Sequence, residues 1–193
     1  MNVFDWKEAF PHIFDGDNPG FDAVIGNPPY LRIQGMQEHY SSQIQYFLDR
    51  YMSAVKRFDL YLLFIEQGFD LLSRNGRLGY ICPHKFANSD FGSGLRDFLL
   101  RHRAIESFVS FGNNLVIEQA STYTSILLLH KSASSAFFFY EFEDMPALKL
   151  RLRLAQLNDV EFAQYEYQNL TGAPWMLMSA SSHALLKKLC NQP

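Results

Sequence analysis

The sequence is poor in cysteine, has no long apolar run and carries little excess charge of either sign. Its two cysteines, Cys82 and Cys190, are too few for a disulfide framework or a zinc cluster, so a reducing cytoplasm is the expected compartment. The apolar runs are only a few residues long, as at 126–129, and a membrane span of about 20 residues is therefore not expected. The first residues show no charged-then-apolar leader, so secretion is not expected either.

The charge balance also limits the function. There are 17 basic and 20 acidic side chains, which gives a formal charge of −3 at pH 7. Proteins that bind nucleic acid through its phosphates usually have a basic surface, so the composition argues against a free-standing nucleic-acid-binding domain, though not against part of a larger one. The 193 residues are 48% hydrophobic and 16% aromatic, which suits one globular domain and excludes a disordered chain.

Turn residues and apolar runs divide the chain into alternating strands and helices. The apolar residues 21–26 predict a buried strand, and a helix is expected from Asp59, as its capping residue, to the helix-ending pair Asn75–Gly76. The order strand, helix, strand, helix, strand is typical of an α/β fold with a parallel sheet and covering helices. Further strands are expected at 77–82, 105–111, 122–130 and, half-exposed in the tail, 148–154, and further helices at 94–101 and 181–189.

The most informative residues are Asn27, Pro28, Pro29 and Tyr30, directly after the first strand. The two prolines fix φ and keep Asn27 out of a helix, so this loop is rigid before any ligand binds. The Asn27 side chain and the Pro28 carbonyl offer two acceptors, and Tyr30 offers a flat aromatic face. At the carboxyl end of a parallel strand, where open α/β sheets bind their ligands, this set suits a planar group that carries an NH2. Asn-Pro-Pro is also a good turn sequence with no chemistry attached, and that alternative stays open.

Two other kinds of site are less well supported by the sequence. The order Cys82-Pro83 reverses the Pro-Cys pair of cytosine-C5 methyltransferases, so a buried thiol is the preferred interpretation. The six histidines have no HxxxH or HxH spacing, so no metal site is expected. His84 and Lys85, after the second strand, are candidates to face a cleft or DNA, although a solvated loop is an equally good interpretation.

Taken together, the tetrapeptide, its flanks and the order of later segments resemble the adenine-N6 DNA methyltransferases of bacterial restriction–modification systems. The most similar branch is the type IIG-like one, in which methylase and nuclease share one polypeptide. The resemblance implies the second half of a Rossmann-like, S-adenosylmethionine-dependent sheet, mostly parallel with an antiparallel last strand, followed by a linker tail. The matching segments are FDWKEAFP (4–11), FDAVIGNPPYLRIQ (21–34), RFDLYLLFIEQGFDLL (57–72), GRLGYICPHKF (76–86), LRDFLL (95–100) and ASTYTSILLLHK (120–131).

The resemblance also implies roles for single residues. Asn27 and the Pro28 carbonyl would accept hydrogen bonds from the amino group of a flipped adenine, with Pro29 completing the rigid loop and Tyr30 stacking on the base. Phe64 would contact the adenine ring of S-adenosylmethionine, with Tyr61 as a weaker candidate; Leu60 and Leu63 are preferred as core residues. The second stacking residue is less certain, because Ile117 matches that position by alignment whereas the nearest aromatic residue is Tyr123.

The family pattern further implies what lies around this segment. About 20 residues precede the first strand, without the glycine-rich turn that forms the main cofactor loop of the family. Residues 1–146 are therefore expected to be the C-terminal half of a catalytic domain, and 147–193 a linker toward a target-recognition domain. We expect duplex DNA as the partner of the full-length enzyme, no membrane partner, and an inactive isolated chain that self-associates through the exposed edge of residues 21–26.

Three other functions remain open at this point. Asn-Pro-Pro-Tyr also marks methyltransferases of release-factor glutamine, and related sequences mark RNA-base methyltransferases. The segment 59–67 (DLYLLFIEQ) and the long insertion at 31–58 favour the DNA branch. The chain could also be a non-catalytic module with folding and docking roles only.

Overall fold

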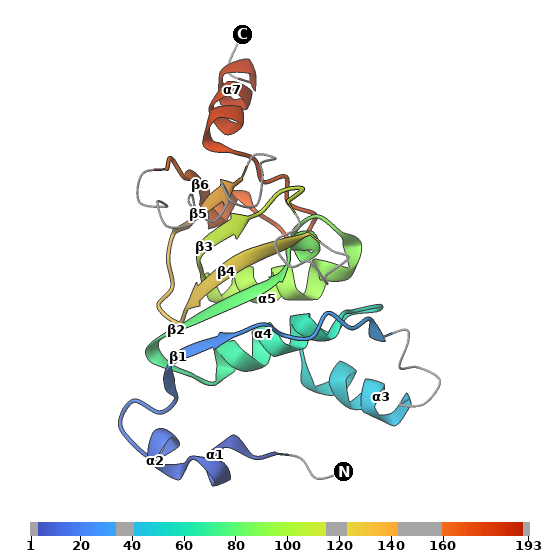
Figure 1. Ribbon diagram of the computed structural model, residues 1–193, viewed down its shortest axis with the longest axis vertical. Coiled ribbons are helices and arrows are strands. Elements are labelled where there is room, and N and C mark those ends of the chain that lie inside the picture. The colour runs from blue at the N-terminus through green and yellow to red at the C-terminus, as the bar shows by residue number, and fades with distance from the viewer. Residues whose placement is uncertain (1–3, 34–40, 115–122, 143–159, 191–193) are drawn as a thin grey trace.

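In the computed structural model, residues 4–33, 41–114, 123–142 and 160–190 are described. They form one six-stranded sheet with the order β1-β2-β4-β3-β5-β6 (Figure 1). β1 is parallel to β2 and β3 to β5, whereas β4 runs antiparallel between β2 and β3, and β6 antiparallel to β5. The predicted α/β sheet with an antiparallel last strand is thus confirmed, and a second strand, β4, also runs against the others. The strands are β1 (Phe21–Gly26), β2 (Leu72–Pro83), β3 (Ile105–Ser110), β4 (Thr124–His130), β5 (Ala136–Glu141) and β6 (Ala163–Glu166).

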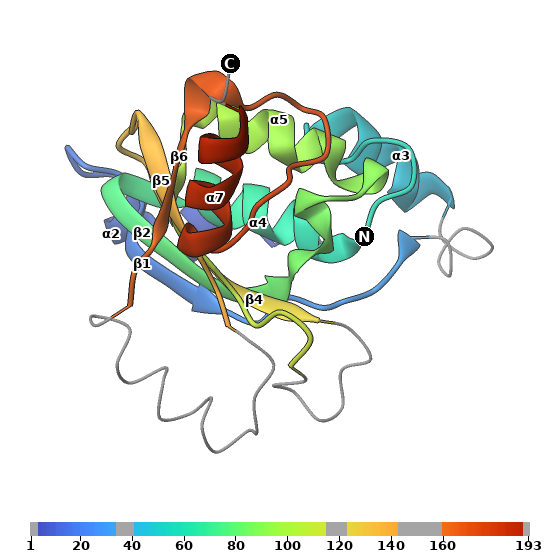
Figure 2. The ribbon, with the colours of Figure 1, turned by 90° about the horizontal axis from the view of Figure 1, so that it is seen from above.

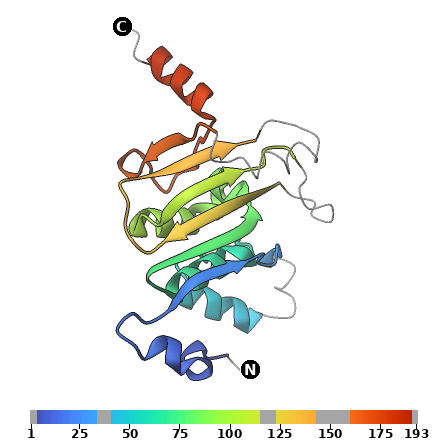
Figure 3. The same ribbon diagram turned by 60° about the vertical axis from the view of Figure 1, so that its left-hand side comes forward.

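The main helices lie on one face of the sheet (Figure 2). α4 and α5 cover its centre, α3 lies beside α4, and α7 extends from the β6 side toward the C-terminus (Figure 1). The short helices α1 and α2 lie below β1, at the edge of the sheet (Figure 3). The helices are α1 (Trp6–Ala9), α2 (Pro11–Phe14), α3 (Ser41–Arg50), α4 (Leu60–Asp70), α5 (Ser93–His102) and α7 (Ala180–Cys190), with 3-10 turns η2 (His84–Ala87), η3 (Asp90–Gly92) and η5 (Tyr167–Asn169).

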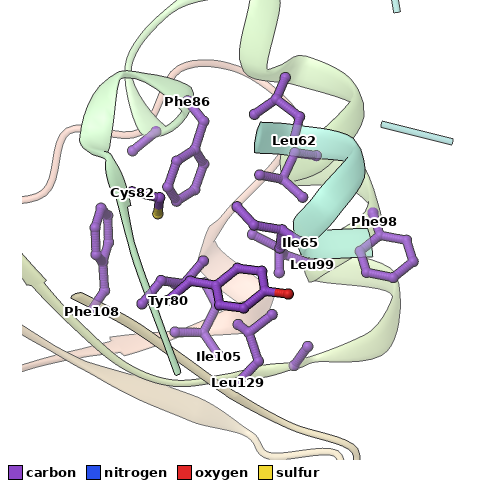
Figure 4. Close-up of a cluster of buried hydrophobic side chains, with 14 of the residues drawn as sticks. Leu62, Ile65, Tyr80, Cys82, Phe86, Phe98, Leu99, Ile105, Phe108 and Leu129 are labelled. Carbon is purple, nitrogen blue, oxygen red and sulfur yellow. The ribbon is translucent and has the colours of Figure 1, made fainter. Parts of the chain in front are cut away.

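The core lies between this helical layer and the sheet (Figure 4). On β2, alternate residues Leu78, Tyr80 and Cys82 are buried, because successive strand residues point to opposite faces. Leu62 and Ile65 of α4 meet them from the helical side, since residues three apart share a helix face. No helix among the residues described here is long and apolar enough to cross a membrane.

The predicted helix at 59–76 is wrong at its C-terminal end. α4 ends at Asp70, and residues 72–76 already belong to β2, where Leu72 pairs with Phe21 of β1. The strand forms here because pairing with β1 satisfies backbone N–H and C=O groups of both strands. A helix that continued past Asp70 would leave the groups of β1 without these partners. Lys131 then donates to the carbonyls of Asp70 and Leu72, at 2.9 and 2.5 Å, and closes the helix end.

The start of α4 also differs from the prediction. Asp59 is the capping residue, but its side chain accepts no capping hydrogen bond. The Leu60 amide instead donates to the carbonyl of Leu31 at 2.8 Å, and Asp59 forms an isolated bridge with Arg32. The Leu31 carbonyl therefore caps the first amide of α4, the role that was predicted for the Asp59 carboxylate.

The prediction that β1 is buried is also wrong for this chain. β1 lies at the edge of the sheet with β2 as its partner, and the Ile25 side chain is 87% exposed. The sequence is apolar enough for a central strand, but no strand in the described part of the chain pairs with its outer edge. Only the Phe21 ring at its start is covered there, by Trp6, Phe10 and Phe14 of the segment that holds α1 and α2. The helices predicted at 94–101 and 181–189 are confirmed as α5 and α7. The strands β5 and β6 were not predicted from the sequence. The strand expected at 148–154 lies outside the described residues.

The insertion at 31–58 contains α3 and is fastened to α4 by a buried carboxylate. The amides of Met52 and Ser53 donate to the Glu66 side chain, at 2.9 and 2.7 Å. The Tyr51 hydroxyl adds a 2.9 Å hydrogen bond to Gln67, the next residue of the same helix. Glu66 is therefore a structural acceptor that fixes the end of the insertion.

Glu66→Ala is expected to lower the free energy of unfolding by about 1–3 kcal/mol, because the buried Ser53 amide and the part-buried Met52 amide lose their acceptor. Urea unfolding followed by circular dichroism measures the change. The matched control is Glu161→Ala, since Glu161 is exposed and should change the stability by less than about 0.5 kcal/mol. Equal, small effects of both substitutions would contradict the anchoring role of Glu66.

Candidate active site at the carboxyl edge of the sheet

The loop Asn27–Tyr30 follows β1 at the carboxyl edge of the parallel pair β1 and β2. Gly26, the last residue of β1, pairs with Tyr80, so the loop lies beside the end of β2. A Cβ atom at position 26 would come within 3.1 Å of the Tyr80 ring, which explains the glycine before the loop. Asn27 and Pro29 are exposed, whereas Pro28 is buried. The loop thus has a buried anchor and an exposed amide, at the edge where α/β sheets bind ligands.

Both ends of the loop are held in place. At its exit, the Leu31 carbonyl accepts from the Leu60 amide, and the Ile33 amide donates to the Phe58 carbonyl at 3.1 Å. In its middle, the Tyr30 hydroxyl donates to the Ile81 carbonyl on β2 at 3.1 Å. These contacts fix a loop that its prolines already make stiff, so little ordering is left for a ligand to impose.

Tyr30 is half-buried, and its ring is oriented by a second tyrosine. The Tyr61 ring lies edge-on to it, with ring centroids 6.4 Å apart and an interplanar angle of 78°. Burial, and to a smaller degree the nearby Cys82, raises the pKa of Tyr30 to about 12. Its hydroxyl therefore stays protonated at neutral pH and keeps donating to the Ile81 carbonyl, with the ring in a fixed plane.

The two predicted cofactor-contact residues differ sharply in exposure. Phe64 is 46% exposed on α4, whereas Tyr61 is 0% exposed and packs in the core. A ligand can therefore reach Phe64 but not Tyr61, which supports Tyr30 instead. Leu63 is buried and Leu60 packs against the core, as preferred from the sequence.

Tyr123 lies on the other side of the end of β2. Its carbonyl accepts from the His84 amide at 3.3 Å, and its ring, 39% exposed, lies 6.1 Å from the His84 ring. Because β2 lies between β1 and β4, Tyr30 and Tyr123 flank the same strand end. Ile117, the alternative stacking position, lies outside the described residues.

Cys82 is a structural residue. Its thiol is buried, lies 3.9 Å from the Ser125 hydroxyl, and has its pKa raised to about 12 by burial. A thiol in this state is not a nucleophile, in agreement with the prediction. Across the described ranges, no three potential metal-ligating side chains come together.

The sequence did not reveal a hydrogen-bonded chain at this same edge, formed by His84, Ser110 and Glu141. His84 Nδ1 lies 3.2 Å from Ser110 Oγ, which donates to Glu141 at 3.0 Å. His84 was predicted to face a cleft or DNA or to lie in a solvated loop, and β5, which ends in Glu141, was not predicted. The available signal for His84 and Ser110 was their position at or just beyond the carboxyl ends of two predicted strands, whereas Glu141 had no predicted strand end beside it.

The protein-family comparison matches residues 1–117 to the Eco57I restriction-modification methylase family. Among curated proteins, the chain is similar to the type II restriction enzyme and methyltransferase RM.Eco57I of Escherichia coli, with 35% identity over 164 residues. That alignment covers 85% of this chain and 16% of RM.Eco57I.

Two solved structures share the fold. The type IIG restriction endonuclease BpuSI matches with a TM-score of 0.59 and 15% identity, over 88% of this chain and 22% of that one. The cryoEM structure of the DrdV-DNA complex matches with a TM-score of 0.56 and 16% identity, over 74% of this chain and 17% of that one. The chain thus spans about a fifth of the length of these proteins, and within that span it shares their fold.

Proposed function

The chain belongs to the Eco57I restriction-modification methylase family, and on that premise we propose that it carries the base-binding part of an adenine-specific DNA N6-methyltransferase. The observation that carries the proposal is the clamped Asn27–Tyr30 loop, with an exposed amide next to an oriented tyrosine at the ligand-binding edge of the sheet. The reaction would transfer a methyl group from S-adenosylmethionine to the exocyclic amine of a flipped adenine.

In this proposal, Asn27 and Pro28 make the amine reactive. An exocyclic amine is a weak nucleophile because its lone pair is delocalised into the ring. The Asn27 side-chain oxygen and the Pro28 carbonyl would each accept a hydrogen bond from one N–H group of the amine. These two hydrogen bonds would draw the amine nitrogen toward tetrahedral geometry. The same acceptors stabilise the positive charge that develops as the methyl group arrives.

Tyr30 and Tyr123 would hold the extruded base. Base flipping costs a few kcal/mol, and one aromatic stack returns about 1–3 kcal/mol of it. Because the Tyr30 hydroxyl is bonded to Ile81, the ring is pre-oriented and little entropy is lost on stacking. The exposed ring of Tyr123, across the end of β2, is the second stacking candidate.

The described residues fit one part of an S-adenosylmethionine site. The 46% exposed ring of Phe64 suits an apolar contact with the adenine of that molecule, whereas Tyr61 is buried and only supports Tyr30. When bound, S-adenosylmethionine supplies a methyl group on a positively charged sulfur.

The wider organisation is also a proposal. We infer that residues 1–146 form the C-terminal half of a methyltransferase catalytic domain. Residues 147–193, whose strand β6 still pairs with β5 of that sheet, would lead toward a target-recognition domain. Duplex DNA would be the partner of the full enzyme, in the cytoplasm. Two observations support this arrangement: the family membership, and the fact that the alignment covers only 16% of the length of RM.Eco57I.

The test is a substrate screen with the polypeptide that carries residues 1–193 together with its cofactor-binding segment. Duplex DNA, RNA and a release-factor peptide are incubated with radiolabelled S-adenosylmethionine, and labelled nucleosides or peptides are identified. The proposal expects label in N6-methyladenine from DNA. Label in RNA or in glutamine would favour the related methyltransferases, and no transfer to any substrate would favour a non-catalytic module.

We also expect the isolated chain to self-associate through β1. The strand edge is unpaired in the described part of the chain, and the adjacent Phe4, Trp6 and Ile25 side chains are exposed. Such an edge pairs readily with a second copy. Sedimentation velocity should show an oligomer whose fraction rises with protein concentration. The substitution Ile25→Lys should suppress this oligomer. The control is Met176→Lys, an exposed residue far along the chain from β1; a strict monomer at high concentration would refute the expectation.

A further inference from the structure

Two exposed cationic side chains, Arg32 and Lys85, lie beside the Asn27–Tyr30 loop. Arg32 follows Tyr30 by two residues, so the two Cα atoms are within about 7 Å of each other. Lys85 lies in η2, directly beyond the end of β2, and the Ile81 carbonyl near that end accepts from the Tyr30 hydroxyl. In the described part of the chain, neither cationic side chain donates a hydrogen bond or forms an ion pair.

Basic residues elsewhere in the fold show the contrast. Arg77 forms an ion pair with Glu106 at 2.8 Å, and the buried Arg96 donates to three backbone carbonyls. Such contacts use the charge to hold the chain together. At Arg32 and Lys85 the charge is left available for a partner from outside this segment.

A single carboxylate is close to both cations. Asp59 forms an isolated backbone bridge with Arg32, and its side chain caps no amide of α4. Burial raises the pKa of Asp59, whereas the charges of Arg32 and then Lys85 lower it, so both cations are near this group. Asp59 also contributes to the raised pKa of Tyr61, which burial dominates, and the Tyr61 ring lies edge-on to Tyr30. Two cations and one carboxylate therefore gather next to the tyrosine pair, with a net positive charge.

The backbone that carries each cation is fixed. Next to Arg32, the Leu31 carbonyl accepts from the Leu60 amide at 2.8 Å. In η2, the Lys85 carbonyl accepts from the Ser89 amide at 3.1 Å. A long cationic side chain on a fixed backbone suits a phosphate group, because the position of the charge is restricted while the side chain still adjusts to the anion.

The proposed substrate brings phosphates to this place. An extruded nucleotide stays bonded through its sugar to the phosphates on its 5′ and 3′ sides, so these groups lie at the rim of the site that holds the base. Phosphate contacts set the register and orientation of a protein on the duplex. Because the whole chain has a formal charge of −3, its contacts to DNA depend on local groups of cations such as this one.

We propose that Arg32 and Lys85 bind the two phosphates that flank the extruded adenosine and so hold its base over the Asn27–Tyr30 loop. Asp59 keeps the two cations near the loop when no DNA is bound. Both are positioning residues, since neither touches the amine or the methyl donor. The inference rests on the proposed methyltransferase function and adds to it the part of the DNA that this segment contacts.

Arg32→Gln and Lys85→Gln are tested in the polypeptide that carries residues 1–193 together with its cofactor-binding segment. The measurement is kcat/KM for methyl transfer to amplified, unmodified genomic DNA between about 50 and 200 mM KCl. The plot of log(kcat/KM) against log[KCl] should become less steep by about 0.9 for each variant and about 1.8 for the double variant, because each lost phosphate contact releases one counterion fewer. This slope corresponds to a loss in kcat/KM of about 15-fold at 50 mM and about 4-fold at 200 mM for each single variant, mainly through KM for DNA.

Two kinds of control separate this role from a structural one. Arg32→Lys and Lys85→Arg keep the charge and should keep the salt slope, whereas a structural role would change the rate and leave the slope as it is. The matched control is Arg101→Gln, because Arg101 is exposed near the end of α5, at the opposite edge of the sheet, and its slope should be unchanged.

The outcomes distinguish this inference from the function on which it rests. Methyl transfer to DNA with an unchanged salt slope in either glutamine variant would overturn the role of that residue and leave the proposed function standing. Absence of methyl transfer by the unsubstituted enzyme would overturn the proposed function, and the phosphate contacts with it.

Discussion

Asn27→Ala is expected to lower kcat for methyl transfer to DNA by about 100- to 1,000-fold, with little change in DNA affinity. The Asn27 side chain is exposed at the end of β1, and the loop that carries it is held by Leu31, Tyr30 and the prolines rather than by Asn27 itself. The substitution should therefore remove an acceptor for the amine without changing the backbone. Single-turnover kinetics with labelled methyl donor measure the effect on the chemical step.

Two further variants separate the acceptor role from a structural one. Asn27→Asp keeps an oxygen that can accept from the amine and should retain more activity than Asn27→Ala. Pro29→Ala, at the neighbouring exposed position, removes ring rigidity but no acceptor and should cost about 10-fold or less. If Asn27→Ala transferred methyl groups at the normal rate, the base-binding role of the loop would be refuted.

Arg96→Met is expected to lower the free energy of unfolding by about 3–5 kcal/mol, the largest stability change among these variants. Arg96 is only 1% exposed. Its guanidinium donates to the carbonyls of Phe86 and Ser89 at 2.6 Å each and to that of Gly172 at 3.0 Å. Methionine fills a similar volume but leaves these three carbonyls without their donor. Urea unfolding at equilibrium measures the loss.

The matched control for Arg96 is Arg101→Met, on the same helix α5 but with an exposed side chain. It should change the stability by less than about 0.5 kcal/mol. Arg96→Lys should recover only part of the loss, because one ammonium group cannot reproduce the planar fork that reaches three diverging carbonyls. A change below about 1 kcal/mol in Arg96→Met would contradict the clamping role.

The Arg96 contacts also matter for the candidate site. Phe86 lies within η2, which begins at His84, and Ser89 is the residue directly before η3. Arg96 therefore ties the segment that carries His84 to α5 and to the tail at Gly172.

Much of the fold could be predicted because local patterns and tertiary packing agree. The helix at 94–101 has its apolar residues on one face, and Leu95, Phe98 and Leu99 are all buried in the structure. The strand at 122–130 and the terminal helix at 181–189 were also placed correctly from their local sequence patterns. The prediction failed at residues 71–76, where pairing with β1 outweighs the helix-ending signal of Asn75–Gly76.

The sequence by itself determined the family, the central strands and helices and the stiff Asn27–Tyr30 loop, because proline geometry, residue periodicity and motif order are properties of the chain alone. Only the tertiary structure decided which aromatic residues a ligand can reach. Phe64 and Tyr61 are three residues apart on one helix, yet one is exposed and the other buried by its neighbours. The structure alone also brought together His84, Ser110 and Glu141, which lie 26 and 31 residues apart, because strand order rather than sequence distance sets which strand ends meet.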